Sequence, residues 1–116
     1  MSVFSEAGKN IMLDGLTPDE VQLHDGDPGA AGTANRVGGT DGEEAATFAA
    51  ASGGERALAS QVDFTGLDAS QSVTWFSVWE DGTFVGKGEL SGDAEANAAG
   101  EISLTTATKL ILDDPA

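Results

Sequence analysis

The 116-residue sequence contains no cysteine, no tyrosine and a single histidine, His24. Without cysteine the chain can form neither a disulfide framework nor a thiolate zinc site, and it lacks a cysteine nucleophile. A single histidine also excludes a pair of imidazole ligands for a metal. The chemistry left to the chain depends on carboxylates, hydroxyls and one imidazole, and its length suits one small domain.

Basic residues are scarce, because five lysines and arginines stand against twenty aspartates and glutamates, for a formal net charge of −15. We therefore expect no binding to nucleic acid or to an anionic membrane surface, since both need clustered lysine and arginine. The acids are scattered along the chain, which indicates a solvated coat on a folded domain. Salt screens the self-repulsion of such a coat, so the composition indicates an environment of high ionic strength. The isolated domain is expected to lose its circular dichroism signal as salt falls from molar to millimolar.

Long apolar runs are absent as well. No stretch approaches the ~18 apolar residues that a membrane-spanning helix needs. The N-terminus lacks the basic start and apolar run of a secretory signal. The sequence therefore predicts synthesis in the cytoplasm and no membrane partner.

Residues 2–14 carry a helical pattern, with Phe4 and Ile11 on one face. Apolar side chains cover more than one face of this helix, so they predict a surface that a partner covers, although the helix could instead plug one end of the domain. We expect a helical arm over 1–16 and a single β domain over 17–116. The candidate interface residues are Phe4, Ile11, Met12 and Leu13.

Beyond Pro18 the apolar pattern alternates with period two between glycine-rich turns. Strands are predicted at about 21–24, 46–48, 58–64, 72–79, 83–90, 102–104 and 110–112. The segment 72–79 has β-branched and aromatic residues on both faces, which predicts a central strand, and Asp81-Gly82 after it predicts a tight hairpin turn. No amphipathic helices separate the strands. The pattern predicts a mainly β protein with a short N-terminal helix, an antiparallel β-sandwich that is jelly-roll-like or immunoglobulin-like.

Trp75 and Trp79 lie four residues apart and so share a face of the predicted strand. They could stack a sugar or anchor a partner, but packing in the core is favoured because Val73 shares that face. Phe76 is a further core or anchor aromatic. Glycines at 86 and 88 in the next strand leave room for a large side chain from this one.

Residues with catalytic or metal-binding chemistry are few. His24 ends a predicted strand with no serine–histidine motif around it, which favours a structural role. Asp25 and Asp27 are weak candidates for a structural cation site, since calcium favours oxygen-rich loops, but the spacing of an EF-hand is missing. No acid–base constellation is visible, so we expect a binding or structural protein without a cofactor and not an enzyme.

Short segments with a characteristic order run through the whole chain. They are SEAGKNIMLD at 5–14, VQLH at 21–24, DPG at 27–29, NRVGG at 35–39, TFAAASGG at 47–54, WFSVW at 75–79, DG at 81–82, GEL at 88–90 and LILD at 110–113. The ordered set resembles the small tail-fibre-like and head-decoration-like virion proteins of tailed bacteriophages. A tyrosine-alanine-arginine run typical of that family after the paired glycines is replaced by Asp41-Gly42-Glu43-Glu44, so partner contacts at that loop do not carry over.

The resemblance implies a structural virion protein, first of all a capsid decoration or cement subunit that binds the head lattice as a symmetric oligomer, with a trimer as the first expectation. Its partner would be the major capsid protein or another virion structural protein, and its location the virion. Together with the acidic coat, it implies a tailed virus of a halophilic archaeon. A tail or fibre component that binds the host surface and a carbohydrate-binding module remain as alternatives.

Overall fold

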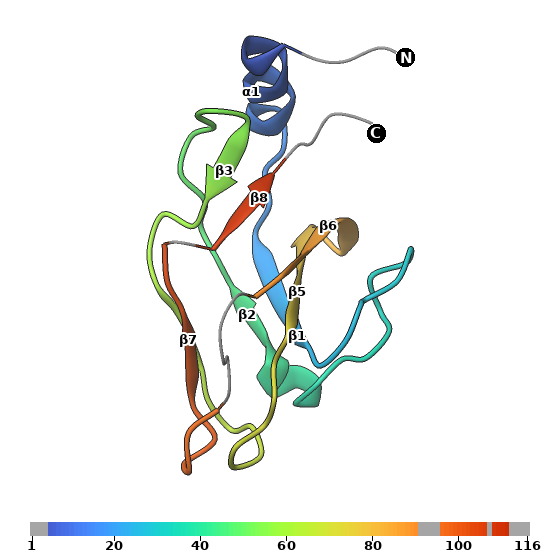
Figure 1. Ribbon diagram of the computed structural model, residues 1–116, viewed down its shortest axis with the longest axis vertical. Coiled ribbons are helices and arrows are strands. Elements are labelled where there is room, and N and C mark those ends of the chain that lie inside the picture. The colour runs from blue at the N-terminus through green and yellow to red at the C-terminus, as the bar shows by residue number, and fades with distance from the viewer. Residues whose placement is uncertain (1–4, 91–95, 107, 112–116) are drawn as a thin grey trace.

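Short antiparallel strands dominate the computed structural model, which describes residues 5–90, 96–106 and 108–111 (Figure 1). In chain order the elements are α1 (Glu6–Asp14), β1 (Glu20–His24), the 3-10 turn η1 (Gly39–Gly42), β2 (Glu43–Ala45), β3 (Glu55–Ala57), β4 (Val62–Phe64), β5 (Trp75–Glu80), β6 (Thr83–Glu89), β7 (Ile102–Leu104) and β8 (Lys109–Ile111). The prediction of a mainly β, sandwich-like protein with one short helix is confirmed.

The largest sheet has the strand order β2-β1-β5-β6, and each neighbouring pair is antiparallel. The predicted central position of the tryptophan strand is confirmed, because β5 lies between β1 and β6. Asp81 and Gly82 form the predicted turn with φ values of 47° and 80°. Both values are positive, as a two-residue turn that matches the twist of a hairpin requires.

Two smaller sheets, β3-β8 and β4-β7, complete the fold. The single strand predicted at 58–64 is wrong in its first half, because only Val62–Phe64 forms a strand there, β4, which pairs with β7. Leu58 makes an isolated bridge with Phe48, and β3, which ends at Ala57, pairs with β8. The strand predicted at 46–48 is displaced. Its place is taken by β2, three residues earlier, since Glu43 and Glu44 lie on an edge strand where carboxylates remain partly exposed.

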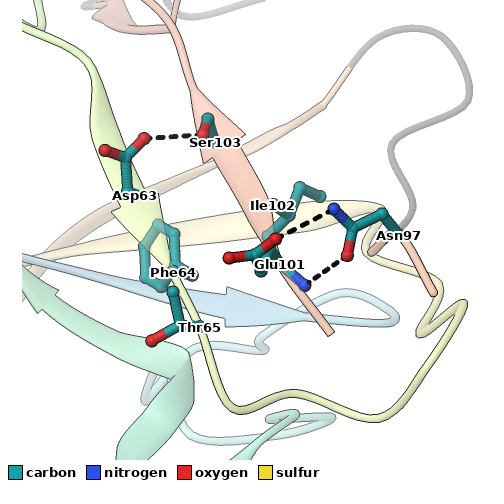
Figure 2. A pocket seen from close by; sticks show the side chains of 7 residues that line it. All are labelled: Asp63, Phe64, Thr65, Asn97, Glu101, Ile102 and Ser103. Carbon is teal, nitrogen blue, oxygen red and sulfur yellow. Dashed lines mark hydrogen bonds between the residues drawn. The ribbon is translucent and has the colours of Figure 1, made fainter. Parts of the chain in front are cut away.

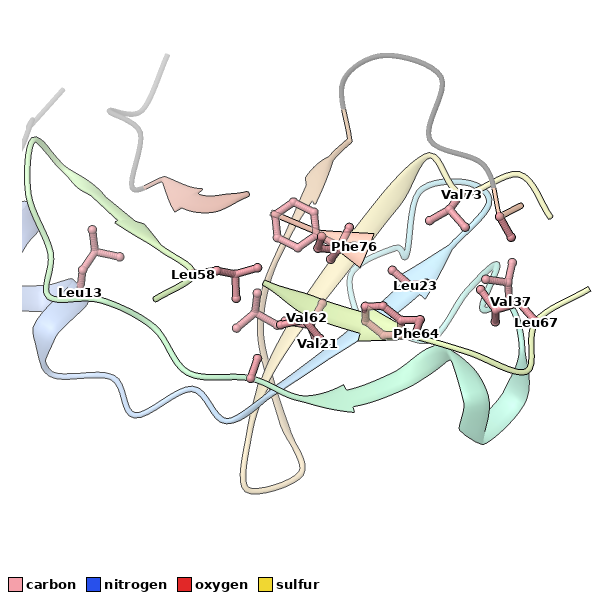
Figure 3. Packing of buried hydrophobic residues seen from close by; sticks show 14 residues of the cluster. Leu13, Val21, Leu23, Val37, Leu58, Val62, Phe64, Leu67, Val73 and Phe76 are labelled. Carbon is pink, nitrogen blue, oxygen red and sulfur yellow. The ribbon is translucent and has the colours of Figure 1, made fainter. Parts of the chain in front are cut away.

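The core lies against one face of the four-stranded sheet, here called the inner face (Figure 3). Along β1 and β5 this face carries Val21, Leu23, Phe76 and Val78, which are at most 3% exposed. The other buried apolar residues of the cluster are Leu13, Val37, Ala46, Leu58, Val62, Phe64, Leu67, Val73, Ala96 and Leu104. Phe76 packs over Gly88 of β6, where a Cβ atom would lie only 2.7 Å from Cε1 of the ring. The expected use of that glycine is therefore confirmed.

Helix α1 lies at one end of the long axis of the molecule (Figure 1). The Ser5 hydroxyl caps its start by accepting a hydrogen bond from the Gly8 N–H at 3.0 Å. Gly15 ends it by donating to the carbonyl oxygens of Ile11 and Met12. Residues 2–4 of the predicted helix lie outside the described residues. None of the helices in the described ranges is long and apolar enough to cross a membrane.

Candidate functional site

Helix α1 is fastened to the β domain through the Arg56 side chain of β3. Nη1 of Arg56 donates to the carbonyl oxygens of Leu13 at 2.8 Å and Leu16 at 2.6 Å, while Nε donates to Ala49 O at 2.9 Å. Carbonyl oxygens at a helix C-terminus have no partners inside the helix and carry partial negative charge. The guanidinium therefore satisfies the end of α1 and joins it to the segment before β3.

Two polar side chains of α1 strengthen this attachment. Asn10 Oδ1 accepts a hydrogen bond from the Gly54 N–H at 2.9 Å, and Asp14 Oδ1 accepts one from the Ala51 N–H at 2.7 Å. With the guanidinium contacts, these bonds hold one side of the helix along its last turns. The opposite side is thereby presented in a fixed orientation.

The predicted interface residues fall into different environments. Ile11 is 75% exposed and Met12 is 38% exposed, so both lie on the free side of α1. Leu13 is buried at 3% and belongs to the core of the chain itself, which corrects its assignment as a residue open to a partner. It points inward because it follows Met12 by one helical step, about 100° further around the axis. Phe4 lies outside the described residues.

The second face of the four-stranded sheet, here called the outer face, is covered by residues 25–37, here called the cover loop. A short main-chain ladder forms its base, where Asp25 N–H donates to Asn35 O at 2.9 Å and Val37 N–H donates to Leu23 O at 3.1 Å. Further out, Gly32 lies so close to the Phe84 ring that no Cβ would fit between them. The loop thus covers the outer-face side chains of the sheet, which alternate along each strand with the inner-face side chains of the core.

A buried chain of hydrogen bonds runs beneath the cover loop. The indole N–H of Trp79 donates to Ser77 Oγ at 2.8 Å, Ser77 Oγ lies 2.7 Å from His24 Nε2, and His24 Nδ1 lies 2.7 Å from Ala34 O. An indole N–H can only donate and a carbonyl oxygen can only accept. The carbonyl oxygen of Ala34 therefore requires the proton on Nδ1, which donates to it. In the neutral imidazole Nε2 is then the acceptor, and the Ser77 hydroxyl donates to it.

The Ser77 and His24 pair has the spacing of a nucleophile and its general base, and motif reasoning on the sequence did not find it because the two residues are 53 positions apart. Both are 0% exposed, so a substrate cannot reach the hydroxyl in this structure. Desolvation lowers the pKa of His24; the nearby Arg36 charge also lowers it, while the Ala34 hydrogen bond and Asp25 raise it. The arrangement supports a structural role for the imidazole.

The aromatic residues of β5 use both faces of the sheet. Phe76 is in the core, and Trp75 and Trp79 are half-buried on the outer face. The Trp79 ring packs against Phe84 with centroids 5.4 Å apart, and Lys87 Nζ lies 5.7 Å from the centroid of Trp75. Each tryptophan thus contacts a side chain of β6. The expectation that both pack in the core with Val73 is wrong, because Val73 belongs to the core cluster and neither tryptophan does.

The weak cation candidates in the cover loop have other partners. Asp27 Oδ1 accepts from Lys87 Nζ at 2.6 Å and from the Gly29 N–H at 2.8 Å. These bonds, the ammonium first, lower the pKa of Asp27. Asp25 contributes its main chain to the base of the loop. In the part of the chain that the structure describes, no three His, Cys, Asp or Glu residues are grouped as a metal ion would need.

A shallow hollow of about 360 Å³ lies beside β4 and β7 (Figure 2). Its carboxylates are already bonded: Asp63 Oδ1 accepts from Ser103 at 2.6 Å and from Gln61 at 2.7 Å, and Glu101 accepts from Asn97 at 3.2 Å. The hydrogen bonds from Ser103 and Gln61 lower the pKa of Asp63. The acids of the hollow are therefore bonded to neighbouring side chains, and they do not form an acid–base pair with each other.

Compared with protein-family models, curated proteins and solved structures, the chain matches none of them. The sequence pointed to His24 and the tryptophans, but it did not point to Ser77, which bonds His24 and Trp79, or to Arg56. The only sequence signal for Arg56 is that it is one of five basic residues in a chain with twenty acids.

Proposed function

We propose that this protein is a structural, non-enzymatic subunit of a tailed-virus particle, and that it decorates the capsid as a symmetric oligomer. The exposed apolar side of α1 is the observation that carries the proposal. The family resemblance and the β-sandwich-like fold agree with it. Within the described residues, the only serine–histidine pair is closed to substrate.

The free side of α1 has the properties of a docking surface. Ile11 at 75% exposure is the most exposed large apolar side chain among the described residues. Burying one such side chain contributes about 1.5–3 kcal/mol. A single copy gains little from that, but several copies joined in a ring add their contacts, so weak docking becomes stable through avidity.

The attachment of α1 explains how such a small contact could be specific. Arg56, Asn10 and Asp14 hold the helix against the β domain, so little orientational freedom is lost on docking. Preorganisation of this kind increases affinity without enlarging the contact. The net charge of −15 further favours a protein partner over packaged nucleic acid.

Copy number in purified virus particles tests the location. Quantitative mass spectrometry against the major capsid protein should give a ratio near one, or near one-third, for a subunit on the head lattice. A few copies per hundred capsid subunits would move the protein to the vertices or the tail. Complete absence from the particle would overturn the proposal.

A variant tests the docking surface itself. Ile11→Asp should abolish binding to capsids that lack the protein, while its circular dichroism spectrum stays unchanged because the side chain is exposed. Ala69→Asp adds the same charge at another exposed position and should bind as the wild type does. Undiminished binding by Ile11→Asp would remove α1 from the interface.

A further inference from the structure

Few side chains of this protein can be oxidised, because the sequence contains no cysteine and no tyrosine. Among the described residues, the oxidisable side chains are Met12, His24, Trp75 and Trp79. His24 is 0% exposed, and both tryptophans are half-buried and in contact with β6. Met12 is 38% exposed and is therefore the most accessible of the four. Its thioether is a common target of oxidation in proteins.

Met12 lies on the free side of α1, next to Ile11 and outside the core. It belongs neither to the buried apolar cluster nor to the partly buried side chains that pack against that cluster. The helix is held to the β domain by other groups, namely the Arg56 guanidinium and the side chains of Asn10 and Asp14. An oxygen atom added to the Met12 sulfur therefore leaves the contacts that hold the helix unchanged.

Oxidation turns this apolar side chain into a polar one. The sulfur lone pair attacks one oxygen of hydrogen peroxide, the O–O bond breaks, and the departing hydroxide takes the proton of the transferred hydroxyl to form water. Sulfur loses two electrons, and the peroxide gains them. The product is methionine sulfoxide, which carries a polar S–O bond. Burial of that oxygen is unfavourable unless a hydrogen-bond donor meets it, and an apolar contact surface supplies none.

We propose that Met12 is an oxidation site that controls docking, and that its sulfoxide releases the protein from the capsid. The inference rests on the proposed function, because it requires Met12 to be buried when the free side of α1 docks. A contact made by few apolar side chains has little to offset one polar atom that loses water and gains no partner. In a symmetric oligomer every copy carries the change, so the losses multiply as the gains from avidity do.

Treatment of the purified protein with hydrogen peroxide tests the site directly. It should add one oxygen atom to the tryptic peptide that starts at Asn10, which cleavage after Lys9 separates from Met1. The circular dichroism spectrum at molar salt should stay unchanged. Binding to capsids that lack the protein should weaken about tenfold per copy, as expected for a buried polar atom without a partner. Methionine sulfoxide reductases should restore binding, since they return the sulfoxide to the thioether.

Two variants separate Met12 from other targets of peroxide. Met12→Leu keeps Met1 and both tryptophans, and its binding before and after peroxide should be equal, whatever its own affinity. Met12→Gln places a polar amide there without any oxidant, so it should bind about as weakly as the oxidised protein and keep the wild-type spectrum.

The outcomes distinguish failure of this inference from failure of the proposed function. Undiminished capsid binding by the oxidised wild type would overturn the inference alone, and so would continued peroxide sensitivity of Met12→Leu. Loss of the circular dichroism spectrum on oxidation would show that Met12 holds the fold, and would also overturn it. Wild-type protein that fails to bind capsids before any oxidation would overturn the proposed function and this inference with it.

Discussion

The two faces of the four-stranded sheet are both buried, but they are buried by different means. The inner face places Leu23, Phe76 and Val78 against apolar side chains of the other strands. The outer face places His24 and Ser77 in a buried chain of hydrogen bonds that ends on the cover loop. It also carries Gln22, whose Oε1 is buried with no hydrogen-bond partner among the described residues. Apolar burial does not depend on direction, whereas the outer face depends on hydrogen-bond geometry and on the charge of one imidazole. The inner face therefore stabilises the fold, and the outer face makes it sensitive to conditions.

The largest expected difference in unfolding free energy is between two phenylalanine variants, one on each face. Phe64→Ala removes a fully buried ring from the inner core and should lower the free energy of unfolding by about 3–5 kcal/mol. Phe84→Ala removes a half-buried ring from the outer face and should cost clearly less. Urea denaturation at molar salt measures both. Equal losses would mean that the outer face is a second full core and would break the comparison.

The next largest loss of unfolding free energy is expected from Ser77, whose side chain lies on the outer face. Ser77→Ala leaves the indole N–H of Trp79 and Nε2 of His24 without their partner, which should cost about 1–3 kcal/mol of unfolding free energy. The control is Ser103→Ala, which removes an exposed hydrogen bond to Asp63 and should change the unfolding free energy by less than about 0.5 kcal/mol. If the two variants are equally stable, the buried chain of hydrogen bonds contributes nothing.

Sequence periodicity predicted the inner face well and the outer face poorly. Alternation along 21–24 was enough to place β1, since side chains in a strand repeat with period two. The run of β-branched and aromatic residues along 72–79 was enough to place β5. Nothing local to His24 or Ser77 indicates that they meet, because their contact depends on strand register. The cover loop is predicted only as a glycine-rich turn region. Its return over the sheet depends on contacts with β6 that are more than fifty residues away in sequence.

The exposed apolar side of α1 was predicted in part. The helical pattern identified Ile11 and Met12, but composition alone could not decide which apolar side chains of an amphipathic segment the chain keeps for its own core. Leu13 is the residue that was misplaced. The attachment of α1 depends on contacts with residues about forty positions downstream, such as the bonds from Arg56 to Leu13 O and Leu16 O. The apolar positions of a helix can be predicted from its own sequence, but which of them pack against the rest of the chain cannot.

Acid should weaken the protein in two separate steps. The pKa of His24 is lowered in the folded protein, so above about pH 6.5 both folded and unfolded states carry a neutral imidazole and stability is complete. Below that value the unfolded chain binds the proton first, and the free energy of unfolding falls by about 1.4 kcal/mol per pH unit until the folded pKa is reached. His24→Gln should remove this step. A wild-type stability that is flat from about pH 7 to 5 would contradict the burial of a neutral imidazole.

The second step belongs to carboxylates. The pKa values of Asp27 and Asp63 are lowered in the folded protein, chiefly by the hydrogen bonds from Lys87 and Ser103. Their contribution is present above about pH 4, the ordinary aspartate range, and is lost as pH falls through their folded values. Both groups are exposed, so this step should be shallower than the histidine step and should shrink with added salt. Asp63→Asn, compared with the wild type across the same pH range, checks it.

The smallest expected effect comes from the ion pair at the edge of the cover loop. Lys87 and Asp27 are bonded at 2.6 Å, but their side chains are 34% and 54% exposed, so salt screens their attraction. Lys87→Met keeps the length of the side chain beside Trp75 and removes its charge, and it should destabilise the protein less than Ser77→Ala does. A double-mutant cycle with Asp27→Asn should give a coupling that shrinks as salt rises from millimolar to molar. A coupling that persists at molar salt would make this pair, rather than His24, the main anchor of the loop on the outer face.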